Sequence, residues 1–366
     1  MLCAEENAGE LSPTELTSPI DDLGDKLIQQ PAVPLLEKAQ GHLLYNLIIK
    51  TILQLENRRD IVILKTIEKN IKAMYIKDEY ICQIEQIGKG SFGVVLKITK
   101  KNGFSYVLKT GSHKDISYES FNIEMLKQGG GNEYVIKTLS PPVVDNNIMA
   151  IVLPFYDTDL RKIIFSEQTL TDNHIKCILV HILIGLNHIH KKNIIHADLK
   201  PANILIQANP LKCIIADLGI AQHIDANGLD IHICSRWYRP PEVILKQPYS
   251  YSVDIWSFGC ILYELITGNI LFKGDQCGDL SCYEELSRKP YNVKGGMFDL
   301  IEENVKTMRA EKKLAIEIRI RNYDTKLLDL FQQCMKINKD ERITAENALK
   351  HPSLIDCVEW IELSKK

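Results

Sequence analysis

The apolar residues of this chain follow two different periods, and each period predicts a different kind of element. Short apolar runs bounded by glycine or polar residues occur at 80–87, 94–98, 106–109 and 213–216, and runs of this kind predict strands. Farther along, apolar residues recur three or four positions apart, which is the spacing of one face of a helix. This helical stripe consists of Ile175, Ile178, Leu179, Ile182, Leu183, Leu186 and Ile189.

The first part of the chain has a different pattern from the rest. Residues 1–34 are acidic and rich in Ser, Thr and Pro, so we expect a disordered tail. In residues 35–77 the apolar positions trace two helical faces, which predicts a helical extension. We interpret this extension either as a hairpin packed on the remainder of the chain or as a regulatory module that docks a partner.

Composition and charge narrow the class of protein without identifying it. The chain has 366 residues, 10 cysteines without CxxC pairs and a formal net charge of −3. Cysteines scattered through apolar runs indicate reduced core thiols, and the charge gives no broad attraction to nucleic acid. No signal peptide and no apolar run of ~20 residues are visible, so we expect no membrane span. We therefore expect an intracellular, cytoplasmic protein, with entry into the nucleus left open.

Residues 196–204 carry the most specific chemical pattern. Asp198, Lys200 and Asn203 follow the helical stripe at relative positions i, i+2 and i+5. Phosphoryl transfer requires these residue types: a carboxylate orients the attacking hydroxyl, a cation offsets charge on the moving phosphoryl group, and an amide oxygen binds Mg²⁺. The segment resembles the catalytic loop of eukaryotic protein kinases, although Ala197 replaces the Arg that usually precedes the Asp.

Three further segments occur in the order that this resemblance requires. Residues 87–95 contain Gly-x-Gly-x-x-Gly-x-Val between two predicted strands. This arrangement favours a hairpin that covers the phosphates of a nucleotide. A dinucleotide-binding site would instead have one strand that leads into a helix. Lys109 then ends the next strand. Asp217 follows the strand at 213–216 in an Asp-Leu-Gly triplet, in which Leu218 replaces the usual Phe.

The resemblance runs from about Asp78 to about Leu354 and implies an α+β protein kinase fold with two lobes. A small β-rich N-lobe over 78–153 and a larger helical C-lobe over 157–356 would form a kinase domain at 78–356.

The resemblance also implies a site for ATP and Mg²⁺. Asp198 and Lys200 would be catalytic, and Asn203 and Asp217 would bind the metal beside the phosphates. The hinge between the lobes would lie at 154–156. The residues expected to contact ATP are Ile87, Gly88, Lys89, Gly90, Ser91, Phe92, Gly93, Val95, Val107, Lys109, Glu119, Pro154, Tyr156 and Leu205.

The carboxylate partner of Lys109 is left open between two residues. Kinases pair this lysine with a Glu on a small-lobe helix, expected here at about 115–128. Apolar residues at the core-facing offsets favour Glu119, because the same offsets from Glu124 hold polar residues and a glycine. A gap-free register instead puts Asn122 at this position.

Later segments place the chain within the family. Residues 235–242 resemble the end of the activation segment in the group that contains the cyclin-dependent, mitogen-activated, glycogen synthase and dual-specificity tyrosine-regulated kinases. By the same resemblance, Asp254 should hold the catalytic loop through hydrogen bonds to its backbone. Arg342 should form a buried ion pair with Glu242.

Two side chains bear on the acceptor hydroxyl. Lys200 argues for Ser and Thr acceptors, because tyrosine-specific kinases usually lack a Lys two residues after the catalytic Asp. Ser235 is expected to bond Asp198 and Lys200, as the matching Ser or Thr does in the family. We therefore expect an ATP-dependent serine/threonine kinase that acts on protein substrates.

Neutral residues near the activation segment change the expected regulation. In the family, the Arg before the catalytic Asp and often a basic residue after Asp-Phe-Gly bind a phosphate on this segment. Here Ala197 and Gln222 take these places, and His232 replaces a tyrosine that is often regulatory. We therefore expect that phosphorylation of the activation segment is not the switch. The alternative is a pseudokinase scaffold without turnover, although a scaffold has no chemical need for Lys109, Asp198, Lys200, Asn203 and Asp217 together.

Overall fold

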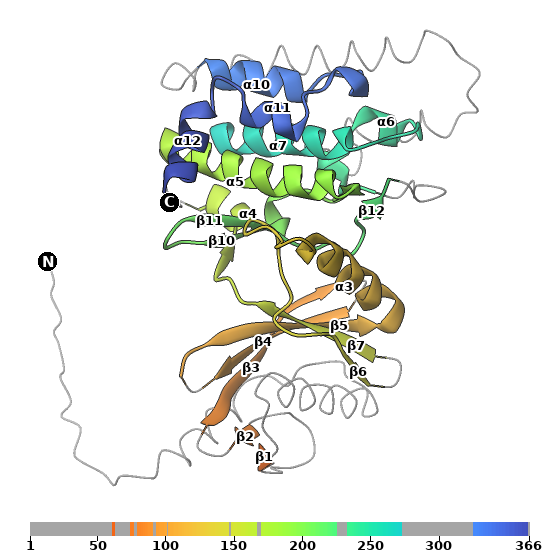
Figure 1. The fold of residues 1–366 in the computed structure, drawn as a ribbon, viewed down its shortest axis with the longest axis vertical. Coiled ribbons are helices and arrows are strands. Elements are labelled where there is room, and N and C mark those ends of the chain that lie inside the picture. Colours follow the sequence, from red (N-terminus) through yellow and green to blue (C-terminus); the bar gives the residue numbers. More distant parts are fainter. Residues whose placement is uncertain are drawn as a thin grey trace, which may run out of the picture.

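The computed structural model places a sheet beside a stack of helices, with short strands between the two parts (Figure 1). The structure describes residues 61–62, 74–76, 79–90, 93–100, 102–145, 148–166, 170–224, 233–272 and 325–364.

The sheet lobe consists of seven antiparallel strands in the order β1-β2-β3-β4-β5-β7-β6. The turn between β3 and β4 lies between Gly90 and Gly93, so the glycine-rich segment joins two strands of one hairpin, as predicted. The strands are β1 (Ile61–Val62), β2 (Met74–Ile76), β3 (Glu79–Gly90), β4 (Gly93–Lys100), β5 (Ser105–Ser112), β6 (Val143–Asp145) and β7 (Ile148–Pro154).

The helix α3 (His113–Lys127) packs against β5 and β7. Its first turn is capped by Ser112, whose hydroxyl accepts a hydrogen bond from the backbone N–H of Asp115 at 3.2 Å. Since Lys109 of β5 lies opposite Ile151 of β7, both side chains project from the same face of the sheet. Ile151 is fully buried on that face, in one core cluster with Ile116 of α3.

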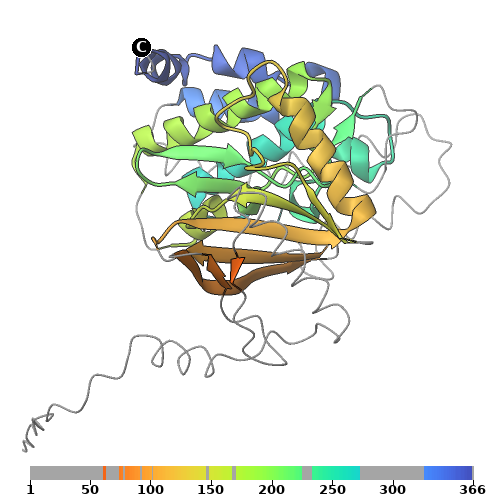
Figure 2. The same ribbon diagram turned by 60° about the horizontal axis from the view of Figure 1, so that its bottom comes forward.

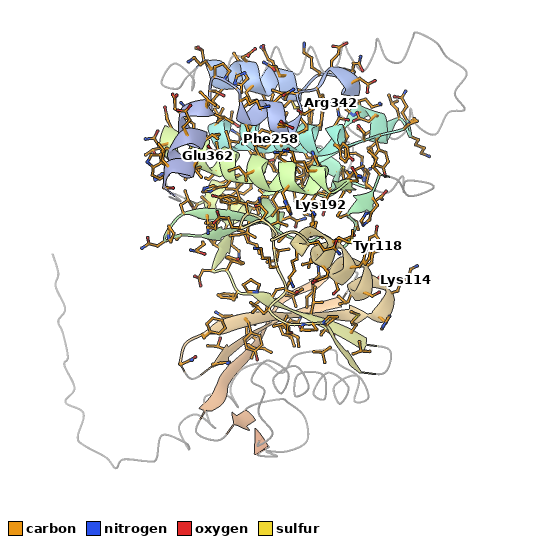
Figure 3. The ribbon with its side chains drawn as sticks, in the orientation of Figure 1. Lys114, Tyr118, Lys192, Phe258, Arg342 and Glu362 are labelled. Atoms are coloured by element: carbon orange, nitrogen blue, oxygen red, sulfur yellow. The ribbon has the colours of Figure 1, made fainter. Side chains whose placement is uncertain are left out.

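The helical lobe is built around α5 (Asp172–Lys191) and α7 (Ser252–Thr267). Every residue of the predicted stripe on α5 is buried, and Phe258 of α7 is buried in the middle of the lobe (Figure 3). Among the described residues, no helix combines the length and the apolar character needed to cross a bilayer. The other α-helices among the described residues of this lobe are α4 (Leu160–Ile164), α6 (Pro241–Ile244), α10 (Lys326–Cys334), α11 (Ala345–Leu349) and α12 (Ile355–Leu363).

Short strands line the side of the helical lobe that faces the sheet (Figure 2). They form a three-stranded sheet in the order β11-β10-β8 and the pair β12-β9. The loop between β9 and β10 carries the predicted catalytic residues, and the loop between β11 and β12 carries Asp217. These strands are β8 (Thr158–Asp159), β9 (Ile194–Ile195), β10 (Ile204–Gln207), β11 (Lys212–Ile215) and β12 (Gln222–His223).

The predicted helical extension at 35–77 is wrong where the structure describes it. Residues 61–62 and 74–76 are strands, and Met74 lies opposite Ile81 in the pairing of β2 with β3. Val, Ile and Tyr favour extended backbone, and pairing with a sheet edge outweighs the helical spacing of the apolar residues. The rest of this extension and the expected tail at 1–34 lie outside the described residues.

Candidate functional site

The Lys109 side chain connects the sheet to two carboxylates. Its ammonium lies 2.7 Å from Oε2 of Glu119 on α3 and 2.7 Å from Oδ1 of Asp217, which follows β11. Strand, helix and the start of the activation segment therefore meet at one cation. Glu124 pairs instead with Lys127 on the exposed side of α3. Of the two glutamates, Glu119 is the one that contacts Lys109.

This cluster shifts the pKa values of its members. Burial favours the neutral form of Lys109, but the adjacent carboxylates outweigh burial and the pKa of the ammonium is raised. Burial also opposes ionisation of Asp217, yet the Lys109 charge outweighs it and the pKa of Asp217 is lowered. The Glu119 side chain is only 3% exposed, and burial raises its pKa even though Lys109 offsets part of the effect. Asp217 is therefore the carboxylate held ready as an anion.

The Asp198 carboxylate is the centre of a second cluster. Its Oδ2 accepts hydrogen bonds from the Lys200 ammonium at 2.6 Å and from the Asn203 amide at 3.2 Å. Its Oδ1 accepts from the backbone N–H of Ser235 at 3.0 Å and from the Ser235 hydroxyl at 2.6 Å. Lys200 also donates to the Ser235 hydroxyl at 2.9 Å. The expected contacts of Ser235 with Asp198 and Lys200 are thus present.

The loop that carries Asp198 is held in place by a side chain of α7. Asp254 is fully buried, and its carboxylate accepts hydrogen bonds from the backbone N–H groups of His196 at 2.9 Å and Ala197 at 3.0 Å. The Oδ2 atom also lies 2.9 Å from Nε2 of His190 on α5. Ala197 and Asp217 both have left-handed backbone, with φ of 65° and 64°. Two strained residues thus flank the site, where a surrounding network holds them in place.

The residues predicted to bind Mg²⁺ come from neighbouring backbone segments. The backbone N–H of Ala216 donates to the carbonyl of Asn203 at 2.9 Å, so Asn203 lies beside the start of the segment that carries Asp217. The Asn203 amide nitrogen is directed at Asp198, which leaves its side-chain oxygen free of that contact. An amide oxygen and an anionic carboxylate are hard donors that suit Mg²⁺. This donor set fits the metal that the fold implies.

The predicted adenine-contact residues share one face of the sheet. Val95 lies opposite Lys109, and Val107 lies opposite Leu153, so all four side chains project from the same face. Pro154 ends β7, and the half-buried Tyr156 and Leu205 pack against the core of the helical lobe. The sequence-predicted roof and floor of the pocket therefore come from different lobes.

The glycine-rich hairpin contains one position where only glycine fits. Gly93 has a φ of 145°, and a Cβ built there would lie 1.9 Å from the carbonyl oxygen of Thr110 in β5. Gly88 meets no such obstacle, since its nearest neighbour would be Val95 at 3.4 Å. Ile87 is exposed, the side chain of Lys89 is not described, Gly90 is the last residue of β3, and Ser91 and Phe92 lie outside the described residues.

The predicted ion pair of Arg342 with Glu242 is also present. The two terminal nitrogens of the guanidinium donate to the carboxylate, with 2.6 Å between Nη2 and Oε2. The Arg342 side chain is 0% exposed, and its Cζ lies 5.0 Å from the centroid of the Trp256 ring. This pair joins α6 to the C-terminal part of the lobe.

Three residues tie α3 to the activation segment through contacts that the sequence did not predict. The amide of Asn122 donates to the carbonyl of Leu218 at 3.1 Å and lies 3.4 Å from that of Ala221. Its Oδ1 lies 3.1 Å from Nε2 of His223, and the Tyr118 hydroxyl donates to the Ala221 carbonyl at 2.7 Å. A polar residue such as Asn122 on the core face of a helix is the signal that predicts a specific polar partner.

Comparisons with known proteins agree with the geometry. A family model described as protein kinase domain matches residues 81–354. Mitogen-activated protein kinase 6 of Oryza sativa subsp. japonica is 34% identical over 294 residues, which cover 76% of this chain and 78% of that protein. Mitogen-activated protein kinase 11 of Arabidopsis thaliana is 32% identical over 302 residues, covering 78% of this chain and 81% of that protein.

A third relative gives a similar match. Mitogen-activated protein kinase 4a of Physcomitrium patens is 34% identical over 286 residues, covering 74% of this chain and 76% of that protein. The chain therefore belongs to the protein kinase family, in the group that contains the cyclin-dependent and mitogen-activated kinases, and is a serine/threonine protein kinase.

Proposed function

We propose that this chain is a catalytically active kinase that transfers the γ-phosphoryl group of ATP to Ser or Thr hydroxyls of proteins. We propose further that it does so without a phosphate on its activation segment. One observation carries both parts: the cluster around Lys109 and the cluster around Asp198 are assembled together in the unmodified chain. A scaffold without turnover would not need both clusters.

On the nucleotide side, the chain supplies charge at fixed positions. Lys109, held by Glu119, would contact the phosphates of ATP, and Asn203 and Asp217 would hold Mg²⁺. When bound, the metal neutralises charge that develops on the phosphates. The side chains of Val95 and Val107 on one lobe and Leu205 on the other would enclose the adenine ring.

On the acceptor side, Asp198 would orient the substrate hydroxyl and accept its proton. A carboxylate offers about four lone-pair sites, and here Lys200, Asn203 and two groups of Ser235 occupy them. An incoming hydroxyl must therefore displace one of these donors. The donor most readily displaced is the Ser235 hydroxyl, because the substrate hydroxyl would donate to the same carboxylate oxygen in its place. Lys200 stays in place to offset charge on the transferred group.

The place where a regulatory phosphate would bind is apolar in this chain. Ala197 is fully buried in a cluster with Ile195, Ile233, Val243 and Val253. The side-chain oxygen of Gln222 accepts a hydrogen bond from the Tyr249 hydroxyl at 2.8 Å. Neither residue offers a cation to a phosphate, so a phosphate would gain little by docking beside them.

Direct hydrogen bonds hold the start of the activation segment in place, which a bound phosphate would otherwise do. Asn122 and Tyr118 bond α3 to the carbonyls of Leu218 and Ala221, within the segment that starts at Asp217. In Figure 3, Tyr118 lies on α3 near the short strands of the helical lobe. These contacts keep Glu119 within reach of Lys109 without any modification.

Phosphate transfer from ATP–Mg²⁺ to a generic protein substrate tests the catalytic part. We expect activity in the wild-type chain and a fall of about 10³-fold in Asp198→Asn, because the amide cannot accept the proton. Equal signal from the two proteins would show that the activity comes from a contaminant and would leave the pseudokinase alternative standing.

Removal of phosphate tests the regulatory part separately. After phosphatase treatment, with mass spectrometry confirming an unmodified segment between His223 and Tyr238, kcat/KM should stay within about twofold, less than 0.5 kcal/mol in barrier. A loss of more than about tenfold that returns when this segment is phosphorylated would contradict the proposal. If the phosphorylated chain were active and only the dephosphorylated chain lost activity, the catalytic part of the proposal would still stand.

A further inference from the structure

Two cysteines from distant parts of the sequence face each other on the helical lobe. The sulfur of Cys177 on α5 lies 3.5 Å from the sulfur of Cys357 on α12, although the residues are 180 positions apart. The two helices contact each other and lie side by side near the C-terminus (Figure 1). Both side chains are half-buried, so small molecules in solvent can reach them.

The other described cysteines have a different environment. Cys213, Cys234, Cys260 and Cys334 are buried, and burial raises the pKa of each thiol. Thiols of this kind are unreactive, because the thiolate is the nucleophile. Exposure and pairing therefore set Cys177 and Cys357 apart from the core thiols.

The contact between the two sulfurs activates one of them. A hydrogen bond from Cys357 lowers the pKa of Cys177 to about 7, although burial acts in the opposite direction. The same hydrogen bond raises the pKa of Cys357, which keeps its proton and acts as the donor. At neutral pH the pair thus holds a substantial fraction of one thiolate next to one thiol.

We propose that Cys177 and Cys357 are a redox modification site, at which a hydroperoxide oxidises the pair to a disulfide that fastens α12 to α5. The Cys177 thiolate attacks a peroxide oxygen, which forms a sulfenic acid and, after protonation, releases one water from hydrogen peroxide. The Cys357 sulfur then attacks the sulfenic sulfur, and hydroxide leaves and takes the remaining thiol proton as a second water. Two thiols are oxidised by two electrons, and one peroxide is reduced.

The packing of α12 permits the movement that this bond requires. A disulfide needs its sulfurs about 2.05 Å apart, closer than the 3.5 Å seen here. α12 spans Ile355–Leu363, and Ile361 is its one buried residue. Trp360 and Leu363 are 62% and 66% exposed, so a small shift of the helix displaces few contacts.

Peptide mapping of the full chain under non-reducing conditions tests the proposal. After treatment with dilute hydrogen peroxide near pH 7.5, we expect a peptide pair that joins Cys177 to Cys357 and is lighter by two hydrogens than the separate peptides. The Cys177→Ser and Cys357→Ser variants should lack it. Cys213→Ala is the matched control, because Cys213 lies close enough for a charge on Cys177 to raise its pKa, and this variant should retain the linked pair. The proposal would be overturned if peroxide linked Cys177 exclusively to Cys213, or if Cys177 and Cys357 both remained open to alkylation after the treatment.

The activation of Cys177 has an independent readout. In Cys357→Ala, the rate of alkylation of Cys177 by iodoacetamide at pH 7 should fall about tenfold, as its thiol returns toward an ordinary pKa. Far-ultraviolet circular dichroism shows whether this variant is folded. An unchanged alkylation rate in a folded variant would also count against the proposal.

Discussion

Oε1 of Glu119 accepts a hydrogen bond from the Lys109 ammonium at 2.9 Å, across the packing contact between α3 and β5. Five residues later on the same helix, Glu124 is 63% exposed and pairs with Lys127. The two glutamates that the sequence offers as partners of Lys109 thus have different surroundings. The difference can be measured with one matched pair of variants.

Glu119→Gln should lower kcat/KM by about 10²-fold, because Lys109 loses a charged partner that orients it toward the phosphates. Glu124→Gln should change kcat/KM by less than about twofold, since surface ion pairs contribute little. Steady-state kinetics with varied ATP measures both. Equal losses in the two variants would place the functional partner of Lys109 elsewhere.

Asn122→Ala should lower kcat more than it raises the KM for ATP. The substitution removes hydrogen bonds that hold α3 against the segment after Asp217, and the Asn122 side chain is not among the residues expected to contact substrate. Loss of buried hydrogen bonds should also cost about 1–3 kcal/mol of unfolding free energy. Ser117→Ala, which removes an exposed hydroxyl on the same helix, is the control and should change neither quantity. A KM effect alone would mean that Asn122 acts on nucleotide binding directly.

Arg342→Met should destabilise the chain by about 3–5 kcal/mol, because it leaves the Glu242 charge buried without a partner. The double variant Arg342→Met with Glu242→Leu should recover much of this loss, since no isolated charge remains. Chemical denaturation of both variants measures the difference. If the double variant lost the sum of the two single losses, the pair would not be energetically coupled.

Glu264 makes the stability of the helical lobe depend on pH. Burial raises the pKa of this carboxyl from 4.5 to about 7, while Tyr238 and Arg161 offset part of the shift. A raised acid pKa means that the folded chain binds the proton more tightly, so stability falls as pH rises from about 4.5 to about 7 and is then constant. Glu264→Gln should therefore be more stable than wild type by about 3 kcal/mol at most near pH 8, and nearly equal below pH 5.

Urea denaturation across this pH range checks the effect. The exposed Glu359→Gln on α12 is the control, and its stability curve should run parallel to that of the wild type. A Glu264→Gln curve that is also parallel to the wild-type curve would contradict the role given to burial.

The sequence was informative where local pattern and chemistry coincide. The stripe on α5 and the Gly93 hairpin follow from residue type and spacing alone, and Lys109, Asp198 and Asp217 were identified by their order along the chain. The same reasoning failed at residues 74–76, where pairing with β3 is a tertiary effect that the helical spacing does not reveal. It also did not predict the contacts of Asn122, because its partners are two backbone carbonyls 96 and 99 residues away and the His223 ring, which carry no mark in the sequence.

The pairing of β2 with β3 has a practical consequence for making shorter forms of the protein. Residues 74–76 pair with residues 79–81 of β3, so a chain cut at residue 78 would leave the backbone groups of this part of β3 open to solvent. Open edges of this kind recruit strands from other molecules. Poor solubility after such a cut would then reflect a bare sheet edge, and a loss of activity could not by itself be assigned to a missing regulatory element.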